Sequence, residues 1–441
     1  MLPDYIAKTT PRPAAGRVPW YVSTAPSYAG TFLWVVFYME IAQGTLDRMG
    51  VALSLAALAV AALVCYALFY RAPAMMGMQT GYPLYVVGSS TFGTKGGYLM
   101  PGLLMGLLQV GWYSVNVYVS TTFIMKGLKL EAGAGSWPFA LAAILWGYSA
   151  ALVGVLGIRY VARVALYLNL IPLAMILMVF ARTAPGIAEY SPPSYAPYVA
   201  FMLLIQMVVG FFSTAGAAGT DFGMNNRDER DVRLGGLVGV SLASFVAGGL
   251  PLVSVAGAHV VYGIQGYTYD AAIAGAGGIL ATAMFLLFAV ASIPPACFCS
   301  FIAGNSFETM LPKIPRMAST MTGITVALVL AITGVAANLV GLFTIVGASF
   351  GPICGAMTAD YLLAGRRWAG PREGVSLPGY LAWALGFVVG ILPFLPIPAE
   401  WKPYTQPAVV YSYLTAFVAY WLAAKAGLEP KTVSLPAAAS R

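Results

Sequence analysis

Apolar stretches of 18 or more residues recur along the whole chain and alternate with short polar connectors. A helix needs about 20 apolar residues to cross a bilayer core of about 30 Å. With 60% hydrophobic and 9% charged residues among 441, the chain is too apolar for a soluble globule. We therefore predict an all-α polytopic membrane protein of about twelve helices. Their expected ranges are 28–46, 50–70, 98–126, 137–157, 160–182, 197–220, 234–261, 276–303, 320–338, 340–363, 378–398 and 405–426.

The basic residues sort to one side of these spans. With the N-terminus in the cytoplasm, eighteen of the 23 Lys and Arg residues lie inside. This bias follows the positive-inside rule, so we expect a cytoplasmic-membrane protein with cytoplasmic tails at 1–27 and 427–441. The first 20 residues lack an apolar core, so no cleavable signal peptide is expected. The net charge of +8 thus orients the chain in its lipid bilayer and requires no nucleic-acid partner.

Two segments in corresponding places suggest that the chain contains a repeat. EIAQGTLD (Glu40–Asp47) and STAGAAGTD (Ser213–Asp221) each combine a glycine-interrupted stretch with Gly-Thr and an acid. Such matched interruptions are typical of transporters built from inverted repeats with broken helices. We expect repeats at 28–182 and 197–363, followed by a final pair at 378–426. The alternative is that glycines such as Gly210 and Gly216 only allow close helix packing.

A polar stripe runs along the predicted third helix. In LLQVGWYSVNVY (107–118), Gln109, Trp112 and Asn116 fall within a sector of roughly 60° on a helix. Amides facing lipid would lose hydrogen bonds, so the stripe must face protein or a cavity. An indole beside two amides suits a flat heteroaromatic ligand, which could stack on the indole and form hydrogen bonds with the amides. The alternative is a packed Trp with interhelical hydrogen bonds.

The predicted sixth helix supplies a second aromatic pair. Phe211 and Phe212 precede Ser213, Thr214 and Gly216, where we expect the helix to be interrupted. One of these rings could enclose a flat ligand together with Trp112, although Phe-Phe in a membrane helix is usually ordinary packing. Thr214 adds a hydroxyl to the candidate substrate-binding set.

Tyr38 and Glu40 are the candidates on the first helix. In WVVFYMEIAQ, Glu40 lies in mid-helix, where a carboxylate is costly and is by default a functional hypothesis. We expect it to couple transport to a cation, with a purely structural acid as the alternative. Tyr38 joins the substrate-binding candidates.

Signatures of enzymes are absent or incomplete in the sequence. GSSTFGTK (Gly88–Lys95) resembles a phosphate-binding loop, but Thr94 stands where that motif requires Lys. There is no HExxH and no G-x-S-x-G. His259, the single histidine, is expected at a helix end, and the cysteines (Cys65, Cys297, Cys299 and Cys354) read as apolar fillers within spans. We therefore expect neither an enzyme nor a cofactor, and no metal.

Several segments together resemble the nucleobase:cation symporter-1 family of cytosine, purine, hydantoin and allantoin permeases. They are TGYPLYVVGSSTFGTKGGYL with LLQVGWYSVN, then AGTDFGMNNR, AGNSFETMLPKI and FGPICGAMTADYLL, in the family's order. The resemblance implies the LeuT-like fold of five plus five inverted helices with two more. It also implies that Gln109 and Trp112 read and stack the base, that Asn116 lies one turn later, and that Phe212 closes the sandwich near Thr214.

The eighth helix departs from the family's pattern. Sodium-coupled members carry hydroxyl residues there, whereas SIPPACFCS has Pro294 and Pro295, and Ala291, Ser292 and Ala296 stand near positions of base-reading Asn residues. The resemblance therefore implies a symporter that imports cytosine, a purine or a related heterocycle by alternating access, coupled to H⁺ through Glu40 or possibly to Na⁺. The alternative is a LeuT-like symporter for another nitrogenous solute (hydantoin, allantoin, an amine or an amino acid), ahead of a membrane-embedded enzyme or sensor.

Overall fold

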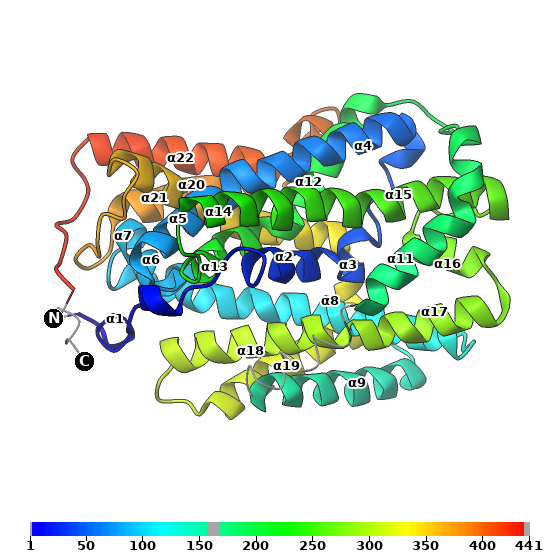
Figure 1. The fold of residues 1–441 in the computed structure, drawn as a ribbon, viewed down its shortest axis with the longest axis horizontal. Coiled ribbons are helices and arrows are strands. Elements are labelled where there is room, and N and C mark those ends of the chain that lie inside the picture. Colours follow the sequence, from blue (N-terminus) through cyan, green and yellow to red (C-terminus); the bar gives the residue numbers. More distant parts are fainter. Residues whose placement is uncertain (1, 157–167, 169, 436–441) are drawn as a thin grey trace.

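The structure, a computed structural model, describes residues 2–156, 168 and 170–435, and these residues are almost entirely helical. The long helices run roughly parallel to the longest axis of an elongated bundle (Figure 1). In the described part of the chain, β-structure is limited to two isolated bridges, Val18 with Asn226 and Arg372 with Thr432. The short helix α1 (Asp4–Ala7) and the segment after α22 (Ala408–Lys425) lie at the same end of the bundle, as an even number of spans requires.

The helices form twelve units in chain order, which confirms the predicted helical architecture. Eight are long and apolar enough to cross a membrane by length and composition, and α19 and α21 are shorter apolar helices. The predicted fifth helix is described only at residue 168 and from Leu170 onward. The units are α2 (Thr24–Phe32) with α3 (Val35–Tyr38); α4 (Leu46–Val64), η2 (Cys65–Tyr70) and α5 (Arg71–Thr80); η4 (Leu99–Leu103) with α8 (Leu104–Gly127); α9 (Trp137–Leu156); α11 (Leu170–Thr183); α12 (Pro197–Ala217) with α13 (Gly219–Gly223); α14 (Glu229–Gly236), η6 (Leu237–Leu242) and α15 (Ala243–Tyr262); α17 (Gly278–Ala291) with α18 (Ile293–Met310); α19 (Arg316–Ile332); α20 (Leu339–Leu363); α21 (Leu377–Gly390); and α22.

The first helix is broken, but earlier than the sequence suggested. It ends at Phe32 and resumes at Val35, with Trp34 extended at φ −68° and ψ 125°. The EIAQGTLD segment instead forms the turns between α3 and α4 and the start of α4. Gly44 adopts a φ of +73°, a left-handed conformation that favours glycine and suits a tight turn. The placement of Glu40 in mid-helix was therefore wrong, because the helix has ended before it.

The sixth helix stays regular through the expected interruption. Ser213, Thr214 and Gly216 all belong to α12, and the helix changes direction only at Ala218, before α13. A Cβ on Gly216 would lie 2.7 Å from the Cβ of Phe69, and one on Gly210 would lie 2.6 Å from the backbone oxygen of Phe343. These glycines therefore serve close helix packing, which was the alternative explanation.

The eighth helix, predicted as one span, consists of two helices that meet at Ser292. Pro294 and Pro295 occupy the first turn of α18, where a missing backbone N–H costs least. Two prolines inside one continuous helix would remove two backbone hydrogen bonds, so the sequence SIPP starts a new helix instead. The break brings the Ser292 backbone into the middle of the bundle, where α8 packs against both α17 and α18.

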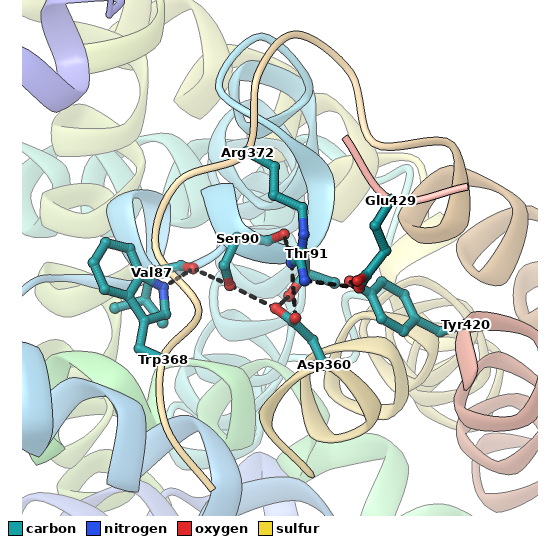
Figure 2. A network of polar contacts seen from close by, with 8 residues as sticks. All are labelled: Val87, Ser90, Thr91, Asp360, Trp368, Arg372, Tyr420 and Glu429. Carbon is teal, nitrogen blue, oxygen red and sulfur yellow. Dashed lines mark hydrogen bonds and ion pairs between the residues drawn. The ribbon is translucent and has the colours of Figure 1, made fainter. Parts of the chain in front are cut away.

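A buried polar network closes the end of the bundle that carries α1 (Figure 2). The carboxylate of Asp360, at the end of α20, accepts hydrogen bonds from the Ser90 hydroxyl (2.6 Å) and the Thr91 hydroxyl (3.0 Å). Arg372 donates to Asp360 at 2.7 Å and to Glu429 at 2.7 Å. The side chains of Asp360 and Arg372 are only 1% and 6% exposed. We call this set the Asp360 network, and it consists of Ser90, Thr91, Asp360, Arg372, Tyr420 and Glu429.

The segment GSSTFGTK contributes to this network rather than to a ligand loop. Its residues include α7 (Ser89–Phe92). Its backbone forms hydrogen bonds with the segment that connects α20 to α21. Arg372 N donates to Ser89 O at 3.1 Å, and Gly374 N donates to the Thr94 hydroxyl at 3.1 Å. Tyr5 of α1 donates its hydroxyl to Thr94 O at 2.8 Å. The glycines of the segment thus allow close backbone packing.

Candidate functional site

Four aromatic rings meet where the break in the first helix faces α8, α12 and α20. Trp112 lies with its ring centroid 5.6 Å from Trp34, 5.2 Å from Phe211 and 5.6 Å from Phe343. Phe211 also lies 6.0 Å from Trp34 and 5.6 Å from Phe343. The four side chains are between 1% and 7% exposed. We call them the aromatic cluster, and they offer several faces and edges on which a flat ring could pack.

Asn116 is held by two hydrogen bonds within the bundle. Its Oδ1 accepts from Trp34 Nε1 at 3.1 Å, and its Nδ2 donates to Ser292 O at 3.1 Å. It is fully buried. Asn116 thus ties α8 to the break in the first helix and to the break in the eighth helix. The stripe avoids lipid as predicted, and for Asn116 the interhelical hydrogen bonds of the alternative explanation are present.

The side chains of Gln109 and Thr214 make fewer hydrogen bonds than that of Asn116. Gln109 is 7% exposed, and its Nε2 contacts the sulfur of Met105 at 3.6 Å, a weak interaction. Thr214 accepts a hydrogen bond from Trp112 Nε1 at 3.3 Å, which links α8 to α12. The Gln109 amide is therefore the group of the polar stripe with the most hydrogen-bonding capacity left for another molecule.

Phe211, rather than Phe212, is the ring of the sixth helix that contacts Trp112. Phe212 is fully buried and stacks on Phe32 at 5.5 Å with an interplanar angle of 15°, and it also lies 5.6 Å from Tyr28. Successive residues of a helix point about 100° apart. Because α12 remains helical through this stretch, the two rings point in different directions. Both lie near Phe32, but only Phe211 also contacts Trp34 and Trp112 and belongs to the aromatic cluster.

Tyr38 supports the broken helix from within. Its hydroxyl donates to Leu33 O at 3.3 Å, a carbonyl at the break, and its ring packs edge-on against Tyr269 at 5.2 Å. Tyr38 is 1% exposed, and its contact with a substrate stays a prediction. The structure thus brings Trp112, Phe211 and Thr214 together but directs Tyr38 toward the helix α16 (Tyr269–Gly275).

Glu40 lies in the turns after α3 and is half-buried. Tyr269 N donates to Met39 O at 2.8 Å, so α16 docks beside Glu40 at the end of the bundle opposite α1 (Figure 1). Asp270, the next residue of α16, pairs with Lys126 of α8. Among the described residues, the side chain of Glu40 has neither a hydrogen bond nor an ion pair. Glu40 is not part of the aromatic cluster, and its role in cation coupling stays a prediction.

Trp34 and Phe343 belong to the cluster, but sequence patterns alone did not single them out. Each lies in an apolar run, TFLWVVFY and LVGLFTIV, where an aromatic residue reads as core or lipid-facing packing. Only the position of the break in the first helix turns Trp34 inward.

Comparison with known proteins finds cytosine permeases among the relatives of this chain. No family model matches the chain. The cytosine permease of Escherichia coli K12 is 27% identical over 325 residues, which cover 71% of this chain and 73% of the permease. The cytosine permease of Escherichia coli O157:H7 is 26% identical over 328 residues, with the same coverage.

Solved structures agree with these relatives. Mhp1, a nucleobase-cation-symport-1 family transporter with bound bromovinylhydantoin, superposes with a TM-score of 0.70, 18% identity, and coverage of 96% of this chain and 95% of Mhp1. A Na⁺-coupled sialic acid symporter superposes with a TM-score of 0.59 and 13% identity, covering 98% and 93% of the two chains. The chain is therefore similar in sequence to cytosine permeases and shares its fold with a nucleobase-cation-symport-1 family transporter.

The LeuT-like fold of these solved structures, with five plus five helices in inverted repeats and two C-terminal helices, is therefore the fold of this chain. The repeat boundaries at 28–182 and 197–363 stay a prediction. In this chain, Ser292 and Ser300 donate their hydroxyl hydrogens to carbonyls one turn earlier in the eighth helix. Ser292 Oγ donates to Phe288 O at 3.0 Å, and Ser300 Oγ donates to Ala296 O at 3.1 Å.

Proposed function

We propose that this protein is a cation-coupled symporter that imports a nucleobase, cytosine or a purine first, by alternating access across the cytoplasmic membrane. The observation that carries the proposal is the aromatic cluster, with the Gln109 amide one turn from Trp112, on a chain related to cytosine permeases. A flat nitrogen heterocycle needs a stacking face and an edge-reading amide, and this site contains both.

The proposed roles follow from the contacts around Trp112. Trp112 stacks the base, Phe211 packs on its other side, and Gln109 reads its edge. Thr214 holds the Trp112 indole through the 3.3 Å hydrogen bond and keeps the stacking face in place. Asn116 holds the site together through its hydrogen bonds with Trp34 and Ser292, and its Oδ1 is an acceptor that a bound base could use in turn. Phe212 supports the site through its packing on Phe32.

Glu40 is the proposed coupling group. Its side chain has no partner among the described residues, unlike the Asp360 carboxylate, which accepts three hydrogen bonds. A carboxyl group without fixed donors can gain and lose a proton at a small structural cost. We therefore propose coupling to H⁺ rather than to Na⁺, because Pro294 and Pro295 stand where sodium-coupled members of the resembled family carry hydroxyl residues. The proposed orientation places both tails in the cytoplasm, on the side of the Asp360 network.

The test is uptake by cells that lack their own base permeases. Cells expressing the protein are supplied with radiolabelled cytosine, adenine, hypoxanthine, hydantoin or allantoin, and Trp112→Ala should abolish the uptake. Trp137→Ala is the matched control, because Trp137 is 77% exposed and lies at the start of α9, away from the cluster. Lack of base uptake by the wild type, with binding of an amine or amino acid instead, would contradict the proposal. Recovery of a chemically altered substrate would indicate an enzyme.

A further inference from the structure

Trp34 has a position that no other residue of the first helix shares. It is the residue at which the helix is broken, with an extended backbone between α2 and α3. The ring lies between α8 and α12, 5.6 Å from Trp112 and 6.0 Å from Phe211, and Trp34 is 7% exposed. The break in the helix and the placement of this indole are therefore parts of one feature.

The indole of Trp34 makes the two kinds of contact that a bound base would make, a hydrogen bond to an amide and a ring contact with Trp112. An indole is itself a planar nitrogen heterocycle with one ring N–H, and that N–H donates to the amide oxygen of Asn116 at 3.1 Å. Its ring lies beside Trp112, which is the proposed stacking residue. A base that enters between Trp112 and Phe211 meets Trp34 in contact with both.

We propose that Trp34 is an internal occupant of the substrate site, and that the incoming base displaces its indole and takes over the hydrogen bond to Asn116. This inference rests on the proposed function. Displacement breaks one hydrogen bond and separates Trp34 from Trp112, so part of the binding free energy is used to release the first helix at its break. Substrate binding is thereby linked to the position of α2 relative to α3.

Two substitutions of Trp34 separate its hydrogen bond to Asn116 from its ring contact with Trp112. Trp34→Phe removes the ring N–H together with the five-membered ring but keeps an aromatic ring, whereas Trp34→Leu removes the aromatic ring as well. If the indole competes with the base, cytosine should bind roughly five-fold more tightly to Trp34→Phe, the equivalent of about one hydrogen bond. Trp34→Leu should bind it more tightly still. Trp368→Phe is the matched control, because Trp368 Nε1 donates to Val87 O at 2.9 Å beside the Asp360 network, and its loss should leave the affinity unchanged.

The measurement is the thermal shift of purified protein titrated with cytosine, adenine, hypoxanthine or hydantoin. Equal or weaker binding by both Trp34 variants, with clear binding by the wild type, overturns the inference and leaves the proposed function standing. Failure of the wild type and all variants to bind any of these compounds overturns both. If a variant does not fold, ¹⁹F NMR of wild-type protein labelled with 5-fluorotryptophan decides. Cytosine should move the resonances of two of the nine tryptophans, Trp34 and Trp112, and movement of one alone overturns the inference.

Discussion

The aromatic cluster and the Asp360 network are both buried, but different forces hold them. The network joins Asp360, Arg372 and Glu429 by charge-assisted hydrogen bonds of 2.7 Å and adds two hydroxyl donors to one carboxylate. The cluster is held by ring contacts of 5.2 to 6.0 Å, with hydrogen bonds from two indole nitrogens. A ring can exchange one aromatic neighbour for another, whereas a buried charge cannot be left without its partner.

This difference suits the two regions to different parts of the proposed transport cycle. The Asp360 network connects the end of α20, the connector before α8 and the segment after α22 (Figure 2), so it fixes these segments relative to one another. The aromatic cluster joins the broken first helix to α8, α12 and α20, and its contacts can be remade around a substrate. Rigid polar anchoring at one end and exchangeable aromatic contacts at the centre are what a rocking bundle requires.

The largest effect is expected from removing the arginine of the network. Arg372→Leu leaves the Asp360 carboxylate buried, with two hydroxyl donors but without its cation. We expect a loss of about 3–5 kcal/mol in stability, because a buried charge without a partner is strongly destabilising. Thermal unfolding of the purified protein measures this loss. Lys8→Ala breaks the exposed pair with Asp4, whose side chains are 76% and 75% exposed, and should leave the unfolding midpoint unchanged. Equal midpoints for Arg372→Leu and the wild type would show that the network is not an anchor.

Two amides of the polar stripe provide the next contrast. Asn116→Leu removes the hydrogen bonds to Trp34 and Ser292 and should cost about 1–3 kcal/mol of stability. Gln109→Leu loses only a weak contact with Met105, so its stability should stay close to that of the wild type while cytosine binding falls. Unfolding midpoints with and without cytosine test both expectations. A large stability loss for Gln109→Leu, or unaltered cytosine binding, would contradict the division of roles between the amides.

The sequence alone predicted the helices better than their breaks. Hydropathy over about 20 residues is a strong signal, so twelve spans were recognised. The break at Trp34 has no glycine or proline beside it, and it depends on packing among α8, α12 and α16. The two prolines of the eighth helix were noted for their missing hydroxyls, although their backbone effect is what starts α18 at Ile293. Local sequence thus marks membrane segments, while tertiary contacts decide where they bend.

The candidate site was predicted in part for the same reason. Periodicity placed Gln109, Trp112 and Asn116 on one buried face, and all three are at most 7% exposed. Periodicity could not decide between Phe211 and Phe212, because neighbouring rings in an apolar helix differ only in what they meet across the bundle. Transport measurements on variants of Gln109, Trp112 and Asn116 test the function proposed for each residue.

The two phenylalanines provide a smaller and more specific contrast. Phe211→Leu and Phe212→Leu remove the same ring from adjacent buried positions, so similar losses of stability are expected. Only Phe211 contacts Trp112, and its loss should weaken cytosine binding by roughly two- to ten-fold, the range for one aromatic contact. Phe212→Leu should bind cytosine like the wild type, since its ring stacks on Phe32. The reverse order of affinities in the same titration would return the stacking role to Phe212.

The smallest effect on stability is expected from a substitution of Glu40. Its carboxylate has no hydrogen-bond partner among the described residues, whereas that of Asp360 has three. Because its side chain has no hydrogen bond or ion pair in the described part of the chain, Glu40→Gln should change stability by less than about 0.5 kcal/mol. The same substitution should abolish the response of cytosine uptake to an imposed proton gradient, because Gln cannot exchange a proton. Uptake at several external pH values, with and without a protonophore, measures this loss. Uptake by Glu40→Gln that still follows the proton gradient would move the coupling site elsewhere, and uptake that follows only Na⁺ would exclude proton coupling. A stable protein that has lost only its proton dependence would separate a carboxylate that serves transport from one, Asp360, that serves structure.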